Sequence, residues 1–369
     1  MKRTLTYKTS TGCNLGCTYC YERRRLGGLL HDKTIPAVSL IEKIEDLAES
    51  NDNLSLMLCL HGGEPLLMGV DAYSSLCERL ITINKLEGKR IAISLQTNGT
   101  LLTSEWVECF SRYQELFSGN GIGISLDGDE VAQNTFRKTL SGEGSYNLVV
   151  DGISNLKQKG LSFGLLAVVS RPSLPRAKRI YEAMTNLSPV VIKFVPCYDF
   201  LPNGNYAPYS VTPLEFVSFL KEIFTYWIKS GVNVNRPVIE PLFSSIMNYQ
   251  GRKVSWCEYN DIKCEDFLLI DANGTIGYCD NLPEFTFPQN IKNVDLDNLL
   301  RFELPEFSKV RAKLRESCKD CSIFSFCKGG CLGTRYNFLT KAATNLKDDY
   351  CNGKKVLFEL IGNVIKRIS

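Results

Sequence analysis

Short apolar runs alternate with stretches of helical periodicity through about the first two hundred residues. The apolar runs are rich in β-branched and aromatic residues, which is typical of buried strands. They lie at Leu5–Thr9, Leu56–Leu60, Ile91–Gln96, Ile122–Leu126, Phe163–Val169 and Val190–Val195. The stretches between them predict helices at Val38–Ala48, Tyr73–Ile83, Glu105–Phe117, Tyr146–Lys159 and Arg176–Leu187.

Strands that alternate with helices predict an α/β fold, with parallel strands joined by crossover helices. Six such units in about two hundred residues predict a partial (β/α)6 TIM-like barrel, because the full eight-unit barrel typically takes about 250 residues. In that architecture, catalytic groups belong at the carboxyl ends of the strands.

The pattern changes near Asn203, where Pro and Gly become frequent. Beyond this point it predicts helices at Pro213–Lys229, Val238–Tyr249 and Val356–Lys366, and a short strand at Phe267–Asp271. From Trp256 onward, cysteines and glycines dominate the chain. We therefore expect a barrel over residues 1–202, a helical connection over 203–250 and a cysteine-rich domain over 251–369.

The composition is that of an ordinary soluble protein, and it points to no nucleic-acid or membrane partner. Lys and Arg number 43 against 40 Asp and Glu, and the one basic run, Arg23-Arg24-Arg25, is typical of a solvated helix face. The sequence has no secretory signal, and its apolar runs are too short to cross a bilayer. We expect a cytoplasmic protein, in which the 15 cysteines stay reduced and those at tight spacings bind metal.

Cys13-x3-Cys17-x2-Cys20 follows the first predicted strand directly. Three thiolates on one short loop can hold three irons of a [4Fe–4S] cluster and leave the fourth iron open to a ligand that is not protein. A zinc site is the weaker alternative, because such sites use paired cysteines or a Cys/His set and the chain has only 2 His.

This spacing, with Tyr19 before the third cysteine, resembles the signature of the radical S-adenosylmethionine (SAM) superfamily. The resemblance implies that SAM is cleaved to methionine and a 5′-deoxyadenosyl radical, which removes hydrogen from a substrate. It also implies that SAM contacts lie at the ends of later strands. These are Gly62, Gly63 and Glu64 for the methionine end, Ser125 for the ribose and Arg137 for the carboxylate, and Tyr19 in the cysteine loop is a further implied SAM contact. Alone, the Gly-Gly pair would predict only a turn.

Eight further cysteines resemble, at every spacing, the SPASM extension of radical SAM enzymes. The resemblance implies two auxiliary [4Fe–4S] clusters, and therefore three clusters in all. Their implied ligands are Cys257, Cys264, Cys279 and Cys331 for one, and Cys318, Cys321, Cys327 and Cys351 for the other. The four cysteines left over are predicted to be apolar core residues: Cys59, Cys77, Cys109 and Cys197.

Two groups of SPASM enzymes act on peptides, and the chain resembles both. The segment from His61 to Leu67, and Glu22 in the place of a Tyr, favour maturases that oxidise or cross-link ribosomally made precursor peptides. The overall length and the pair Cys279-Asp280 favour the alternative, an anaerobic sulfatase-maturating enzyme that converts Cys or Ser to formylglycine. We rank the precursor-peptide maturase first. An iron–sulfur electron-transfer protein without radical chemistry is the remote third hypothesis.

The resemblance to these two groups also implies roles for residues near the substrate. By the resemblance to sulfatase-maturating enzymes, Asp280 would be the base that deprotonates the substrate, although it could equally accept backbone hydrogen bonds in a turn. Gln96 and Asn98 would face the peptide, whereas His61 could be either catalytic or a packed core residue. The expected partners are a precursor peptide or protein and a flavodoxin- or ferredoxin-type electron donor. Peptide recognition would fall to the barrel mouth, to the insertion Asn203–Gln250 or to a separate leader-binding protein, because only twelve residues precede Cys13.

Overall fold

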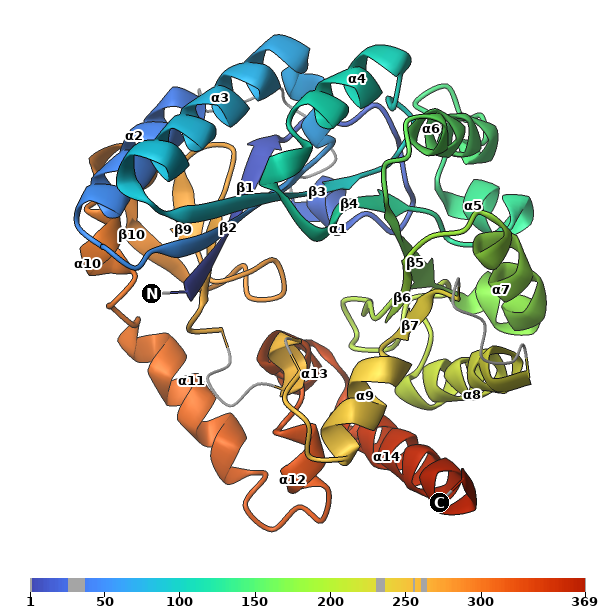
Figure 1. The fold of residues 1–369 in the computed structure, drawn as a ribbon. Coiled ribbons are helices and arrows are strands. Elements are labelled where there is room, and N and C mark those ends of the chain that lie inside the picture. The colour runs from blue at the N-terminus through green and yellow to red at the C-terminus, as the bar shows by residue number, and fades with distance from the viewer. Residues whose placement is uncertain (1, 26–36, 230–235, 255, 260–263, 369) are drawn as a thin grey trace. The chain divides into compact units, whose positions relative to one another are not determined.

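The computed structural model describes residues 2–25, 37–229, 236–254, 256–259 and 264–368 (Figure 1). Contacts divide the chain into two compact units. The first unit comprises Met1–Leu126, Gln133–Gly164 and Glu265–Leu304, and the second comprises Asp127–Ala132, Leu165–Cys264 and Pro305–Ser369. Both units are built from segments that lie far apart in the sequence. The predicted domain boundaries at 203 and 251 stay predictions.

The first unit contains a mostly parallel sheet. Its strands lie in the order β10-β9-β8-β1-β2-β3-β4. Their bounds are β1 Lys2–Ser10, β2 Ser55–Gly62, β3 Arg90–Thr97, β4 Phe117–Ser125, β8 Phe267–Ile270, β9 Thr275–Gly277 and β10 Thr286–Asn290. β8 and β1 to β4 pair in parallel, whereas β9 pairs antiparallel with both β8 and β10. The predicted α/β class with a parallel sheet is confirmed, and closure into a partial barrel stays a prediction.

Burial alternates strictly along β2 and β3. Leu56, Leu58 and Leu60 of β2 are buried, whereas the residues between them are only partly buried. This is the period of two that a strand requires. The helices of this unit are α1 Tyr21–Arg25, α2 Ala37–Glu49, α3 Val70–Glu87, α4 Ser104–Arg112, α6 Tyr146–Gln158 and α10 Leu296–Leu299, and α5 Glu130–Phe136 begins in the other unit. In Figure 1, α2, α3 and α4 follow one another along the outer side of β2 and β3.

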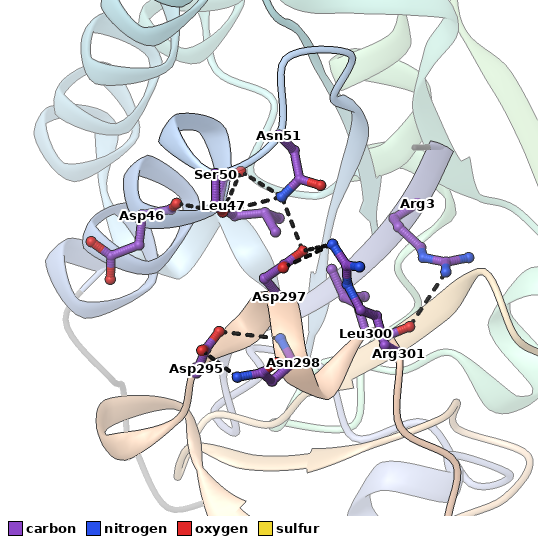
Figure 2. A network of polar contacts seen from close by, with 10 residues as sticks. All are labelled: Arg3, Asp46, Leu47, Ser50, Asn51, Asp295, Asp297, Asn298, Leu300 and Arg301. Atoms are coloured by element: carbon purple, nitrogen blue, oxygen red, sulfur yellow. Dashed lines mark hydrogen bonds and ion pairs between the residues drawn. The ribbon is translucent and has the colours of Figure 1, made fainter.

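Residues 265–304 return from the C-terminal part of the chain to the edge of β1. Figure 2 shows the polar contacts that hold them: Asn51 donates to Asp297 at 3.0 Å, and Arg3 donates to the carbonyl of Leu300 at 3.3 Å. Arg301 forms an ion pair with Asp297 at 3.0 Å. Because β8 pairs with β1, residues near 280 lie beside the first strand.

The second unit contains the strands β5 Gly164–Val169, β6 Val191–Pro196 and β7 Val238–Glu240. β7 pairs with β6 in parallel. Its helices are α7 Ala177–Asn186, α8 Pro213–Lys229, α9 Leu242–Tyr249, α11 Pro305–Glu316, α12 Phe324–Cys327, α13 Leu332–Lys341 and α14 Asp349–Ile368. The long helix α14 packs against α8 and α9. No helix within the described residues is long and apolar enough to cross a membrane.

All seven predicted strands are present, but three predicted helices depart most from their expected bounds. The helix expected at Glu105–Phe117 ends at Arg112, and Phe117 begins β4. The helix expected from Val238 is a strand as far as Glu240, because a residue before proline avoids the helical region, and α9 begins only after Pro241. α14 begins at Asp349 and not at Val356.

The start of α14 at Asp349 was not predicted, because Gly353 has a low helix propensity and weakens the helical pattern. A Cβ at this glycine would lie 2.5 Å from Cβ of Pro213, the first residue of α8. The glycine therefore allows the two helices to approach closely. The same early start places Cys351 on the first turns of a long, packed helix.

Candidate active site at the strand ends of the first unit

The cysteine loop Cys13–Cys20 follows β1 and is held by backbone hydrogen bonds. The amide of Gly16 donates to the carbonyl of Lys138 at 2.7 Å, and the amide of Thr18 donates to the carbonyl of Phe136 at 3.1 Å. These bonds align the loop with the segment that follows α5. The loop is thus part of the packed unit, and its three cysteines have defined positions.

The three cysteines of this loop are reduced and suit an iron–sulfur cluster, in which each thiolate would bind a different iron. Burial raises the pKa of Cys13 to about 12, although its sulfur accepts a hydrogen bond from the amide of Leu15 at 3.4 Å. Among the residues that the structure describes, no three His, Cys, Asp or Glu side chains converge on one metal ion.

The glycines that end β2 lie directly against this loop. The amide of Gly63 donates to the carbonyl of Ser10 at 2.8 Å, and the amide of Glu64 donates to the carbonyl of Gly12 at 2.8 Å. A Cβ on Gly63 would lie 1.9 Å from the carbonyl oxygen of Gly12. Only glycine fits there, so close backbone approach is the requirement at this position.

Gly63→Ala is therefore expected to displace the cysteine loop. We expect the free energy of unfolding to fall by about 3 kcal/mol, at the upper end of overpacking costs, because the clash is with backbone. Denaturant titration of the protein checks this. Gly88→Ala is the control: Gly88 has a positive φ of 61° but no atom near its Cβ position. It should cost only about 1 kcal/mol, and an equal cost for both variants would contradict the clash.

Glu64 is fully buried and holds the end of β2 to the end of β3. Its carboxylate accepts hydrogen bonds from the amide of Asn98 at 2.7 Å, the hydroxyl of Thr97 at 2.7 Å and the amide of Leu66 at 3.0 Å. Burial outweighs these bonds and raises the pKa of Glu64 to about 7. Both carboxylate oxygens thus accept bonds from the protein's own donors.

Asn98 lies against the cysteine loop. Its side-chain amide donates to Oδ1 of Asn14 at 2.8 Å and lies 3.7 Å from the sulfur of Cys13. Asn14 in turn donates to Thr100 at 2.8 Å. The sequence analysis did not single out Asn14, and a lone Asn in a cysteine loop carries no signal that would have found it.

Ser125 and Gln96 lie side by side at the ends of β4 and β3. The amide of Gln96 donates to the hydroxyl of Ser125 at 3.2 Å. Arg137 is buried, and its guanidinium lies 5.4 Å from the ring centre of Tyr19. All the residues predicted to contact SAM therefore lie in the first unit, on its cysteine loop, at its strand ends or just after α5.

Lys8 joins two carboxylates that lie far apart in the sequence. Its side chain is 2% exposed, and its ammonium forms ion pairs with Asp280 at 2.6 Å and with Glu22. Glu22 follows the cysteine loop, and Asp280 follows Cys279. A cavity opens beside them, and its wall includes Lys8, Cys279 and Asp280. The sequence analysis missed Lys8, and the available signal was a lysine inside a strand of buried residues.

Asp280 is held as a carboxylate. Burial raises its pKa, but the charge of Lys8, the nearby His61 and hydrogen bonds from Lys8 and Tyr21 outweigh burial, so the pKa lies below its usual value. The side chain is 23% exposed. Asp280 is therefore an ionised carboxylate at the edge of a cavity, and the ion pair with Lys8 limits its basicity.

The other cysteines are reduced as well. Cys279 lies in the first unit, and the remaining seven predicted auxiliary ligands lie in the second. Cys318 and Cys327 are buried, and the others of this set are partly buried. Of the four predicted core cysteines, Cys77, Cys109 and Cys197 are buried, whereas Cys59 is only partly buried.

Comparison with known proteins finds similarity to a family model and to several enzymes. The model of the radical SAM superfamily matches residues 7–171. The cysteine-type anaerobic sulfatase-maturating enzyme of Clostridium perfringens (strain ATCC 13124) is 29% identical over 362 residues, which cover 95% of this chain and 93% of that enzyme. The serine-type enzyme of Bacteroides thetaiotaomicron is 27% identical over 348 residues, which cover 88% of this chain and 81% of that enzyme.

The fold of the chain is also similar to that of a solved enzyme. Native anSMEcpe with bound AdoMet has a TM-score of 0.83 at 27% identity, and the match covers 99% of this chain and 100% of that one. The same enzyme with bound AdoMet and Cp18Cys peptide has a TM-score of 0.80 at 25% identity, and that match covers 99% and 98% of the two chains. The similarity therefore extends over nearly the whole length in both sequence and fold.

Proposed function

The chain is an enzyme of the radical SAM superfamily, and from this premise we propose that it oxidises a Cys or Ser side chain of a sulfatase to formylglycine. The observation that carries the proposal is the similarity to anaerobic sulfatase-maturating enzymes over 95% of the chain. The Cys279-Asp280 pair beside a cavity supports it. The comparisons thus favour the function that the sequence analysis ranked second.

SAM and a [4Fe–4S] cluster follow from the family, and Cys13, Cys17 and Cys20 would hold that cluster. When bound, the two supply the 5′-deoxyadenosyl radical that removes a hydrogen atom from the substrate. Gly62 and Gly63 would serve the methionine end of SAM by letting the cysteine loop pack closely against the end of β2. Glu64 would act on this site indirectly, by fixing the strand ends through its hydrogen bonds to the backbone.

The remaining SAM contacts come from the other strand ends. Ser125 would contact the ribose, with Gln96 beside it. Arg137 would pair with the SAM carboxylate, and the ring of Tyr19, over which the Arg137 guanidinium lies, would help to position Arg137. Because Asn98 donates to the cysteine loop, we assign it to support of that loop as well as to the peptide side of the site.

Conversion of a Cys or Ser side chain to an aldehyde removes one hydrogen atom, one proton and one electron. Asp280 would accept the proton, because its carboxylate is ionised and faces a cavity. The electron would leave through auxiliary clusters held by the C-terminal cysteines. A Cys substrate then exchanges its sulfur for oxygen by hydrolysis. A flavodoxin- or ferredoxin-type protein would supply the electron that cleaves SAM.

Maturation of a ribosomally made precursor peptide is the second candidate. Two residues beside Asp280 favour it, namely Glu22 and His61, because they depart from the sulfatase-maturating pattern. Lys8 forms ion pairs with both Glu22 and Asp280. The chain therefore has two carboxylates at this place, whereas the sulfatase-maturating pattern has one carboxylate and one tyrosine. A separate leader-binding protein would belong to this candidate only.

Anaerobic incubation with sulfatase peptides distinguishes the two candidates. The reconstituted enzyme, SAM and a reductant are mixed with matched peptides that carry Cys, Ser or Ala at the modified position. We expect the Cys or Ser peptide to give an aldehyde that reacts with a hydrazide probe, and the Ala peptide to stay unchanged. If fragmentation shows loss of two hydrogens without an aldehyde, the product is a cross-link and the sulfatase assignment is wrong.

A further inference from the structure

Arg335, on α13 of the second unit, is a buried cation without a carboxylate partner among the described residues. Its residue is 6% exposed. The guanidinium donates to the carbonyl of Gly329 at 3.2 Å and to the hydroxyl of Ser317 at 2.7 Å, and both acceptors are neutral. A buried charge with only neutral partners is destabilising, so an anion is expected beside it.

Another buried cation of the same unit is satisfied in the usual way. Lys354 forms an ion pair with Glu258 at 2.5 Å, and Glu258 also accepts a hydrogen bond from Tyr350 at 2.6 Å. The unit therefore does provide a carboxylate where a buried lysine needs one. Arg335 differs from this pattern, and its surroundings differ as well.

Arg335 lies close to a cysteine of one predicted ligand set. A Cβ built on Gly329 would lie 3.3 Å from Nη1 of Arg335 and 3.7 Å from the sulfur of Cys318, so these groups share one small space. The two acceptors of Arg335 are also neighbours of predicted ligands, because Ser317 precedes Cys318 and Gly329 follows Cys327 by two residues. The guanidinium is therefore held beside the predicted ligand set Cys318, Cys321, Cys327 and Cys351.

We propose that Arg335 compensates the charge of a [4Fe–4S] cluster held by Cys318, Cys321, Cys327 and Cys351, and thereby raises its reduction potential. This inference rests on the auxiliary cluster assigned under the proposed function. Four thiolates on an oxidised [4Fe–4S] core leave a net negative charge, and uptake of one electron increases it. A buried cation stabilises the reduced form more than the oxidised form, because attraction grows with charge and is weakly screened away from water.

A purely structural role would give different results. If the guanidinium only ties Ser317 to Gly329, its charge would not affect the cluster once the fold is intact. Arg335→Gln removes the charge and keeps a hydrogen-bonding amide, whereas Arg335→Lys keeps the charge and loses the planar fork. The potential separates the two roles.

The test is an EPR-monitored redox titration of the anaerobically reconstituted full chain, with iron and sulfide counted in each sample. A variant with Cys13, Cys17 and Cys20 replaced by Ala identifies the signals of the auxiliary clusters. In Arg335→Gln, we expect the ratio of reduced to oxidised cluster at fixed potential to fall about tenfold for one auxiliary signal, which is about 59 mV for one electron. Arg335→Lys should stay within about threefold of the parent.

Lys319→Met is the matched control. Lys319 lies next to Cys318, but its side chain is 71% exposed, so solvent screens its charge. Its removal should leave both auxiliary signals nearly unchanged. If the reduction potential shifted equally in Lys319→Met and Arg335→Gln, the cause would be the general charge of the surface, and the proposal would be overturned.

Iron content decides the remaining outcomes. If Arg335→Gln loses about four irons per chain and Arg335→Lys keeps them, the charge is needed to hold the cluster and the proposal is supported. Loss in both variants, full loading with an unchanged potential in Arg335→Gln, or no cluster on these cysteines in the parent each overturns it. No peptide is oxidised in this experiment, so failure of the sulfatase assay does not bear on it.

Discussion

Replacing Cys13, Cys17 and Cys20 together with Ala abolishes SAM cleavage. We expect 5′-deoxyadenosine formation to fall at least about 10³-fold, to background, because these three cysteines would hold the cluster whose open iron binds SAM. The loop keeps its backbone bonds to residues 136–138, so the fold of the first unit is retained. Chromatography of anaerobic reactions measures the product, and circular dichroism checks the fold.

A buried cysteine of the same unit provides the control. Cys77 is fully buried in α3 and lies outside the predicted ligand sets. Cys77→Ala should cost about 1 kcal/mol of stability and leave SAM cleavage intact. If the triple variant still releases 5′-deoxyadenosine at the parental rate, the loop is not the site of radical formation and the assignment of the whole site is wrong.

Local pattern was enough to predict the framework of the first unit. β1 to β4 could be predicted from their apolar runs, because a buried strand needs only apolar side chains at a period of two. Gly62 and Gly63 were singled out by the superfamily resemblance, because the pair alone would predict only a turn. The structure gives the reason in full, since Gly63 lies against Gly12.

Contacts between distant parts of the chain were not predictable in the same way. Nothing in the local pattern of Phe267–Ile270 indicates that β8 pairs with β1, because a parallel strand can join at any free edge. Without that pairing, Asp280 cannot be placed beside Lys8. The resemblance to SPASM enzymes singled out Asp280, but the lysine that holds it comes only from the structure.

Buried charges show the same limit. Lys8 and Arg335 were two among 43 basic residues in the sequence, and such residues are mostly exposed. Both are buried next to cysteines or carboxylates that come together only in the folded chain. The motifs in the sequence thus predicted the ligands of the site. The buried charges near those ligands could be identified only from contacts in the folded chain.

Asp280→Asn is expected to separate SAM cleavage from product formation. The amide cannot accept a proton, so we expect peptide oxidation to fall about 10²- to 10⁴-fold, the range for loss of a general base. Release of 5′-deoxyadenosine should continue, because Asp280 is not among the residues that would hold SAM. The ratio of aldehyde to 5′-deoxyadenosine, measured in one reaction, therefore falls by the same factor.

Glu22→Gln is the matched comparison, because it removes the other carboxylate from the same lysine. Both variants leave Lys8 with one acidic partner, so the disturbance of the buried ion pairs is similar. If Asp280 is the base, the ratio of aldehyde to 5′-deoxyadenosine in Glu22→Gln should fall no more than about tenfold, which is less than the loss expected for removal of a general base. Equal losses in the two variants would mean that Lys8 and its pairs matter only for structure. Full product from Asp280→Asn would mean that another group accepts the proton. If aldehyde formation fell only in Glu22→Gln, Glu22 would be that acceptor.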